Sequence, residues 1–254
     1  MRAANADNPV EHFTNAPIQE ALLDIQVLLP TDIVVPTLKT FGQGLEDRFP
    51  EQQERFEFVQ SLQLNPSGDP QPSSPAKNIE AYLFSSKASG KTVQAKRDGF
   101  TFNKLRPYTK WDDFNPEARE LWLRYVEIAR PRCIKRVSLR YINRIEIPDA
   151  TTDLRDLCLL FPDVPKGVPQ LWLEYFQRFV SPKPDSTVAI VTLAIDVPMA
   201  AGRPAIILDI DVCRFFENVP PDANAIWPHF DELRALKNEI FDASLTPKAK
   251  GLFR

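Results

Sequence analysis

The sequence predicts an α+β fold in which largely antiparallel strands are backed by helices. Three observations support this prediction. Several segments alternate apolar and polar residues with a period of two, which is typical of half-buried strands. Three segments carry apolar residues at helical spacing. Asp98-Gly99 lies between two strand-like segments and suits a tight hairpin turn, because both residue types tolerate positive φ. Antiparallel strands with helices on one face define this class.

The first half of the chain is expected to contain a strand, a helix, further antiparallel strands and a second helix. The first helix is expected at 32–49, although Gly42 and Gly44 weaken it. The second is expected to start with Asn115 as its cap and Pro116 at the first helical position, and to stop before Pro131. The residues expected to face inward from the first helix are Val35, Leu38, Phe41, Leu45 and Phe49. The strands are expected at 18–29, 56–64, 79–86, 91–97 and 100–105, with a Pro/Ser-rich loop at 65–78.

The second half repeats this order of elements. The two closing helices open alike, with Pro116 to Leu121 in one and Pro228 to Leu233 in the other. We therefore expect pseudo-duplicated strand-helix-strands-helix halves, 15–131 and 132–254, packed as one unit after a flexible arm at 1–14. The expected strands of the second half are 133–148, 170–180, 187–197 and 205–213, and the expected helices are 153–160 and 228–241, with a last helical turn from Thr246-Pro247.

Composition excludes several classes of protein. A chain of 254 residues with 43% hydrophobic residues can bury a substantial core, so global disorder is not expected. The net charge of −3 argues against a protein that coats nucleic acid. The apolar runs are too short to span a membrane, and no secretory signal is visible. Three widely separated cysteines predict buried, reduced thiols and a cytoplasmic location.

The segment from Cys133 to Pro148 is the nearest approach to a site. With a period of two, one face carries apolar residues from Val137 to Ile147, and the other carries a polar strip. The residues of this strip are Arg136, Ser138, Arg140 and Arg144. Guanidinium groups at this spacing can hold phosphates or carboxylates in bidentate fashion. The alternative is an ordinary polar sheet face whose arginines pair with carboxylates of neighbouring strands. The candidate carboxylates are Glu20, Asp24, Glu174, Asp196, Asp209 and Asp211.

Other motifs fall short of a catalytic signature. Asp209 and Asp211 share a strand face and could hold Mg²⁺, but no third ligand stands at a recognisable spacing. The segment from Ser89 to Thr92 ends like a phosphate-binding loop, yet Ser85 replaces the required glycine and a strand pattern follows. The two histidines, His12 and His229, have no catalytic partner in sequence context. We therefore predict no catalytic residue, no metal site and no cofactor.

Aromatic residues crowd the region from 100 to 125. Their spacing favours core packing over a stacking platform for bases. Tyr108 and Trp111 lie in an expected loop and are therefore predicted to be partly exposed contacts for a partner.

Several short sequence motifs, taken together, resemble those of a sporadically distributed family of uncharacterised prokaryotic proteins of about this length. They run from Ala16 to Ala21, from Asp98 to Phe100 with Tyr108 and Trp111, from Leu139 to Ile145, and from Lys237 to Phe241 near Leu252-Phe253. The resemblance covers nearly the whole chain. It implies no catalytic residue, and scattered occurrence of this kind implies an association with mobile or defence-related gene neighbourhoods.

Three functional hypotheses follow. The first is a non-enzymatic cytoplasmic binding or assembly protein, as an accessory or sensor in a multi-protein system, with a protein partner or a second copy of itself. The second is a nucleic-acid binder that uses Arg136, Arg140 and Arg144, which the net charge does not favour. The third is a metal-dependent enzyme acting on phosphoesters, centred on Asp209 and Asp211. None involves a membrane.

Overall fold

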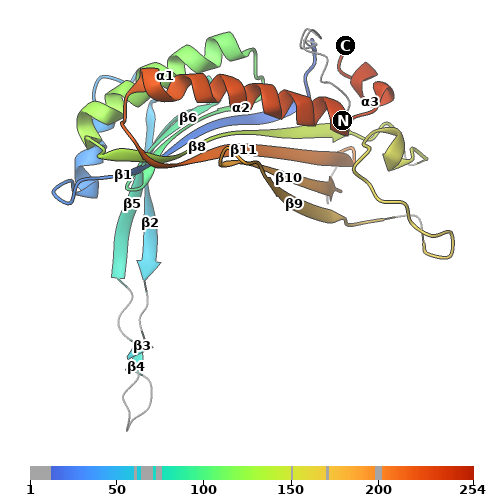
Figure 1. Cartoon of the computed structure of the whole chain (residues 1–254), viewed down its shortest axis with the longest axis horizontal. Helices are drawn as coiled ribbons and strands as arrows, with labels where there is room; N and C mark the ends of the chain where they lie inside the picture. Colours follow the sequence, from blue (N-terminus) through green and yellow to red (C-terminus); the bar gives the residue numbers. More distant parts are fainter. Residues whose placement is uncertain are drawn as a thin grey trace.

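In the computed structural model, nine strands form one open antiparallel sheet, and the helices pack against one of its faces (Figure 1). The structure describes residues 13–59, 62–63, 71–72, 76–149, 151–169, 172–197 and 202–254. The predicted α+β class with an antiparallel sheet is confirmed. The expected arm lies almost wholly outside the described residues, and so does most of the expected loop at 65–78.

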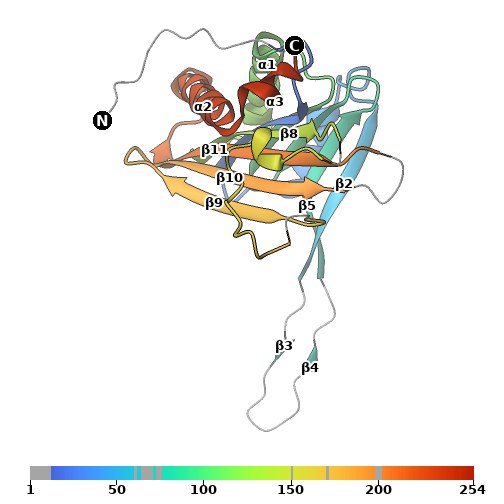
Figure 2. The ribbon, with the colours of Figure 1, turned by 90° about the vertical axis from the view of Figure 1, so that its right-hand side faces the viewer.

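The sheet has two edges and a central pair of long strands. Its strands, in chain order, are β1 (Ile18–Leu28), β2 (Glu51–Val59), β5 (Ala76–Ser86), β6 (Lys91–Lys96), β7 (Gly99–Leu105), β8 (Cys133–Glu146), β9 (Phe176–Pro182), β10 (Thr187–Asp196) and β11 (Ala205–Val219). Their spatial order is β2-β5-β6-β7-β1-β8-β11-β10-β9. A separate two-stranded ribbon, β3 (Leu62–Gln63) with β4 (Gln71–Pro72), lies beyond the projecting ends of β2 and β5 (Figure 2).

The helices are α1 (Trp111–Ala129), α2 (Ala223–Ser244) and the short α3 (Pro247–Gly251), and two 3₁₀ helices are η1 (Val35–Gly42) and η2 (Leu154–Asp156). Both long helices cover the same face of the sheet (Figures 1 and 2). They contact each other through Trp111 Nε1, which donates to Asp231 Oδ1 at 3.1 Å, and Trp227 Nε1, which donates to Asn115 Oδ1.

The two halves of the chain use the same order of connections. In each, the first strand pairs with the last strand before the long helix: β1 with β7, and β8 with β11. The halves then join where β1 pairs with β8 along almost its whole length. One sheet and one core result.

The core lies between the helices and the sheet, and it contains the aromatic cluster that the sequence assigns to packing. Phe102 stacks on Phe114 with ring centroids 4.9 Å apart, and Trp122 stacks on Tyr125 at 5.5 Å. These four side chains are buried, so the core interpretation is confirmed.

The helix expected at 32–49 is wrong in type and length, because only the 3₁₀ helix η1 forms there. Four of its five predicted inward residues, Leu38, Phe41, Leu45 and Phe49, are nevertheless buried. The two glycines explain the difference. Gly44 has a φ of 75°, and a Cβ on Gly42 would lie 2.4 Å from a ring carbon of Phe84. The chain turns at these glycines so that it can pack closely against β5.

The other helices differ from expectation at their boundaries. The helix expected at 153–160 is reduced to η2. α1 begins at Trp111 and α2 at Ala223, four or five residues before the predicted starts, so Pro116 and Pro228 both lie inside their helices. The predicted cap Asn115 instead accepts the hydrogen bond from Trp227. The final helical turn is confirmed as α3, with Thr246 Oγ1 accepting from the backbone N–H of Ala249 at 3.2 Å.

Candidate functional site

The face of the sheet opposite the helices carries the predicted polar strip. β8 alternates as expected, with Val137, Leu139 and Tyr141 buried on the helix side. Arg136, Ser138, Arg140 and Arg144 point to the other side. Among the described elements no helix covers this side (Figure 2).

Each arginine of the strip is paired with a carboxylate. Arg140 makes a bidentate contact with Asp209, with Nε to Oδ1 at 2.8 Å and Nη2 to Oδ2 at 2.6 Å. Arg144 contacts Asp196 at 3.3 Å and Glu146 at 3.5 Å. The hydrogen bonds that Arg140 donates to Asp209 raise the pKa of Arg140 above its ordinary value.

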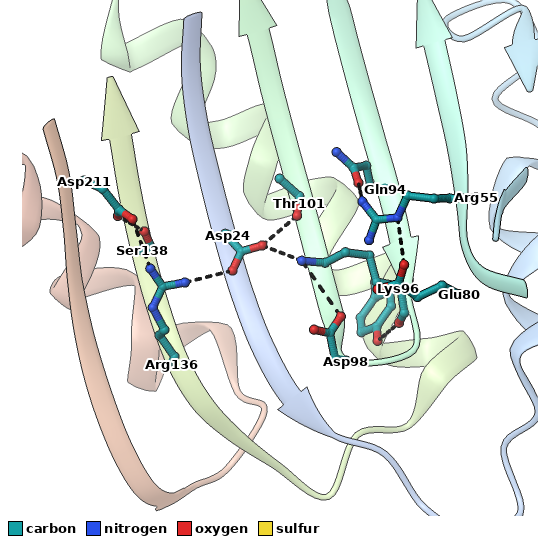
Figure 3. A network of polar contacts seen from close by, with 11 residues as sticks. Asp24, Arg55, Glu80, Gln94, Lys96, Asp98, Thr101, Arg136, Ser138 and Asp211 are labelled. Carbon is teal, nitrogen blue, oxygen red and sulfur yellow. Dashed lines mark hydrogen bonds and ion pairs between the residues drawn. The ribbon is translucent and has the colours of Figure 1, made fainter. Parts of the chain in front are cut away.

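Arg136 is the centre of a longer network (Figure 3). Its guanidinium reaches Asp24 Oδ2 at 3.4 Å and Asp211 Oδ2 at 3.2 Å, and Ser138 Oγ donates to the other oxygen of Asp211. Asp24 also accepts from Lys96 Nζ at 2.6 Å and from a threonine of β7 at 2.6 Å. Four of the six carboxylates named from the sequence therefore pair with the strip. These are Asp24, Asp196, Asp209 and Asp211.

This arrangement balances positive and negative charge, and it leaves few charged groups of the strip free to bind a ligand. Cations on β6 and β8 contact carboxylates on β1 and β11, which stabilises the central part of the sheet. An incoming phosphate would have to displace a carboxylate from each arginine. Within the described part of the chain, no group of three His, Cys, Asp or Glu side chains could hold a metal ion, and Asp209 and Asp211 are engaged by arginines.

The two aromatic residues predicted as partner contacts lie close together but differ in exposure. Tyr108 lies in a loop and is half-buried, with its hydroxyl 2.9 Å from that of Tyr141. Burial raises the pKa of Tyr108 to about 12. Trp111 is the first residue of α1 and is buried against α2, with Arg234 over its ring. The expectation of a partly exposed loop tryptophan is therefore wrong, because α1 starts earlier than the proline rule indicates.

The strand expected at 170–180 is β9, Phe176–Pro182, but the sequence did not place it at an edge of the sheet. Its outer side pairs with no other strand of the described sheet. Phe176 is 68% exposed and Val180 is 51% exposed. The apolar alternation at 176–180 was a usable signal for a strand, but position at an edge depends on strand order, which is not local in sequence.

The opposite edge, β2, differs in chemistry. Four of its nine residues are charged, and they are Glu51, Glu54, Arg55 and Glu57. β9 has only Arg178 among seven residues. Charged side chains on an edge strand discourage pairing with another chain, so β2 is protected in this way and β9 is not.

The cysteines and one of the two histidines lie in the described part of the chain. All three cysteines are buried and free, and His12 lies outside the described residues. His229 lies 2.7 Å from Arg214 and 3.5 Å from Glu232 in a surface ion cluster. None of the described helices is long and apolar enough to cross a membrane.

Comparison with protein-family models gives no match to this chain. A search of curated proteins likewise finds no significant match.

Proposed function

We propose that this chain is a non-enzymatic binding and assembly protein that associates with a second copy of itself through β9. The single observation that carries the proposal is the unprotected apolar edge at β9, set against the charged edge at β2. Exposed, weakly charged edge strands pair readily with other chains. Pairing of β9 with β9 of a second copy would extend one sheet across a twofold axis.

The backbone geometry of β9 supports this pairing. Lys183 N donates to Thr187 O, and Tyr175 O accepts from Ile195 N, so the odd-numbered residues direct their backbone groups toward β10. Backbone groups alternate in direction along a strand. The N–H groups of Phe176, Arg178 and Val180 therefore point away from the sheet and are available to another strand.

The sequence of β9 disfavours one register and allows another. If the twofold axis passes by Phe179, Arg178 lies opposite Val180 of the second copy, and Phe176 lies opposite its Pro182. If the axis passes by Arg178, two guanidinium groups lie directly opposite each other, which is destabilising. The register centred on Phe179 pairs no like charges.

Replacement of Val180 by proline tests the proposal. The N–H of Val180 points outward and makes no bond to β10, so the edge strand should tolerate proline while the intermolecular ladder loses a donor. Sedimentation velocity should show a concentration-dependent dimer for the wild-type protein and a monomer for Val180→Pro. Val180→Thr keeps the N–H and the β-branched side chain, and should remain dimeric.

A wild-type protein that stays monomeric at every concentration would contradict the proposal. So would a Val180→Pro variant that dimerises as tightly as wild type. Circular dichroism of the variant checks that its fold is retained.

We also propose a cytoplasmic location for the protein and an internal duplication as the origin of its two halves. The three buried free cysteines fit a reducing cytoplasm. The shared order of connections in the two halves, and the proline at the sixth position of both α1 and α2, support an internal duplication. An accessory or sensor role in a multi-protein system, and the family resemblance, remain predictions.

The nucleic-acid and metal-enzyme hypotheses have less support. Both rely on residues that already pair with each other, Arg136 with Asp211 and Arg140 with Asp209. The nucleic-acid hypothesis would gain support if the protein bound nucleic acid and Arg140→Ala abolished that binding. The metal-enzyme hypothesis would gain support from a Mg²⁺ or Mn²⁺ binding signal that Asp209→Asn abolishes.

A further inference from the structure

A cleft on the helix side of the sheet has a different character from the face described above. It lies between the β5–β6 turn, the end of β7 and the first turns of α1, and has a volume of about 490 Å³. This is within the usual range for small-molecule sites. Four cationic side chains line it, Lys87, Lys91, Lys104 and Arg106, against two carboxylates, Asp113 and Glu117.

The two carboxylates neutralise only part of this positive charge. Glu117 is shared between Lys91, at 2.6 Å, and Arg48, at 3.1 Å. Asp113 lies 3.7 Å from Lys110, which is not among the lining residues, and accepts from Thr109. Lys87 pairs with Glu51, at 3.1 Å, outside the cleft.

Lys104 and Arg106 form no ion pair with a carboxylate of the described residues. Lys104 Nζ donates to the backbone oxygen of Ser89. Burial lowers the pKa of Lys104, and the nearby charge of Lys91 lowers it further. The guanidinium of Arg106 is exposed and makes no hydrogen bond or ion pair with the described part of the chain.

A buried hydroxyl in the same cleft also lacks a partner. Ser89 Oγ is covered by neighbouring atoms and forms no hydrogen bond with the described residues, so its side chain must rotate to another rotamer before the hydroxyl can meet a ligand in the cleft. Buried polar groups without a partner are uncommon in folded proteins and call for a specific explanation, such as a ligand that completes the bond. Excess positive charge and an unpaired hydroxyl in one cavity both point to an anion.

We propose that this cleft binds a small molecule that carries a phosphoryl group, held by Lys104, Arg106 and Ser89. Arginine binds phosphate in bidentate fashion, lysine acts as a point charge, and a serine hydroxyl donates to a phosphoryl oxygen. The site does not use the phosphate-binding-loop mechanism. Lys91 begins strand β6, with no helix directly after it, as the strand pattern in the sequence predicts.

Isothermal titration calorimetry with pyrophosphate as the probe tests the proposal. Wild-type protein should bind with a dissociation constant below about 1 mM. Lys104→Met and Arg106→Gln should each weaken binding about tenfold, since each removes a charge-assisted hydrogen bond. Lys166→Met, at an exposed position outside the cleft, makes the same change of charge and should bind like wild type.

Ser89→Ala separates a role in binding from a role in folding. Loss of an unpaired buried hydroxyl should leave the melting temperature unchanged or raise it, while pyrophosphate affinity falls about fivefold. A variant that binds as tightly as wild type would show that the hydroxyl does not face the ligand.

Absence of pyrophosphate binding to the wild-type protein would overturn the proposal. Equal affinity in Lys104→Met, Arg106→Gln and wild type would also overturn it, as would an equal loss in Lys166→Met, because the effect would then be one of overall charge. Arg106 is exposed, so Arg106→Gln keeps the test valid if Lys104→Met fails to fold. None of these outcomes depends on the state of the β9 edge.

Discussion

Lys237 shows how one residue can set the pH dependence of stability. It lies on the buried face of α2 with 9% of its surface exposed, and its Nζ lies 4.1 Å from the ring centroid of Tyr141. No carboxylate of the described residues forms an ion pair with it. Burial, together with the positive charge of Arg234, lowers the pKa of Lys237 from its ordinary 10.5 to about 7.

The sign of the effect follows from proton uptake. Between pH 7 and pH 10.5 the unfolded chain holds a proton on Lys237 that the folded chain releases, so stability should rise with pH across this window. Lys237→Met should remove this rise and stabilise the protein at pH 7 by an amount on the order of a few kcal/mol. Urea unfolding at pH 7 and pH 9.5 measures both effects.

Lys166→Met at an exposed site is the matched control and should change neither value. A wild-type protein with equal stability at the two pH values would show that Lys237 keeps an ordinary pKa.

At the scale of single residues, the sequence predicts pairing partners better than exposure. The alternation in β8 correctly separates arginines from apolar residues, and four of the six carboxylates named from the sequence pair with the strip. Trp111 could not be placed in the same way, because its burial depends on contact with Asp231 of α2, 120 residues away.

At the scale of elements, the network around Asp24 ties four strands together. Lys96 on β6, Thr101 on β7, and Arg136 on β8 all contact the Asp24 carboxylate on β1. Lys96 and Arg136 are largely buried, with side chains 10% and 15% exposed. Removal of the shared carboxylate would leave two cations with less compensation.

Asp24→Asn should therefore destabilise the protein by about 3–5 kcal/mol, the typical cost of breaking a buried ion pair from one side. Asp98→Asn is the matched control. Asp98 is exposed, and its carboxylate is as far as 4.0 Å from Lys96 Nζ. Its replacement should therefore have little effect on stability. Chemical denaturation of both variants measures the difference, and equal stability of Asp24→Asn and wild type would mean that the network contributes little.

Helix boundaries were less predictable than strands for a physical reason. Proline is favoured in the first turn of a helix because its missing N–H is unpaired there anyway. In α1 and α2 the proline stands at the sixth position, where it removes one internal hydrogen bond. Tertiary contacts of the preceding turns, such as Trp111 with Asp231 and Asn224 with Arg119, hold these turns in helical form.

At the scale of the whole molecule, alternation and hairpin signals predict the strands and the antiparallel class. These local signals do not predict the order of the strands in the sheet. β1 pairs with β7 and β8, and β8 pairs with β11, across long stretches of intervening chain. The identity of the two edges follows only from this order, so the contrast between β2 and β9 could not be recognised before the structure.

Hydrogen exchange at β9 tests the central claim, that this edge pairs with a second copy, most directly. The amides of Arg178 and Val180 point away from β10, so in a monomer they exchange quickly with solvent. Both amides should become protected as protein concentration rises, whereas the outward amides of β2 should not. Fast exchange of Arg178 and Val180 at every concentration would contradict it.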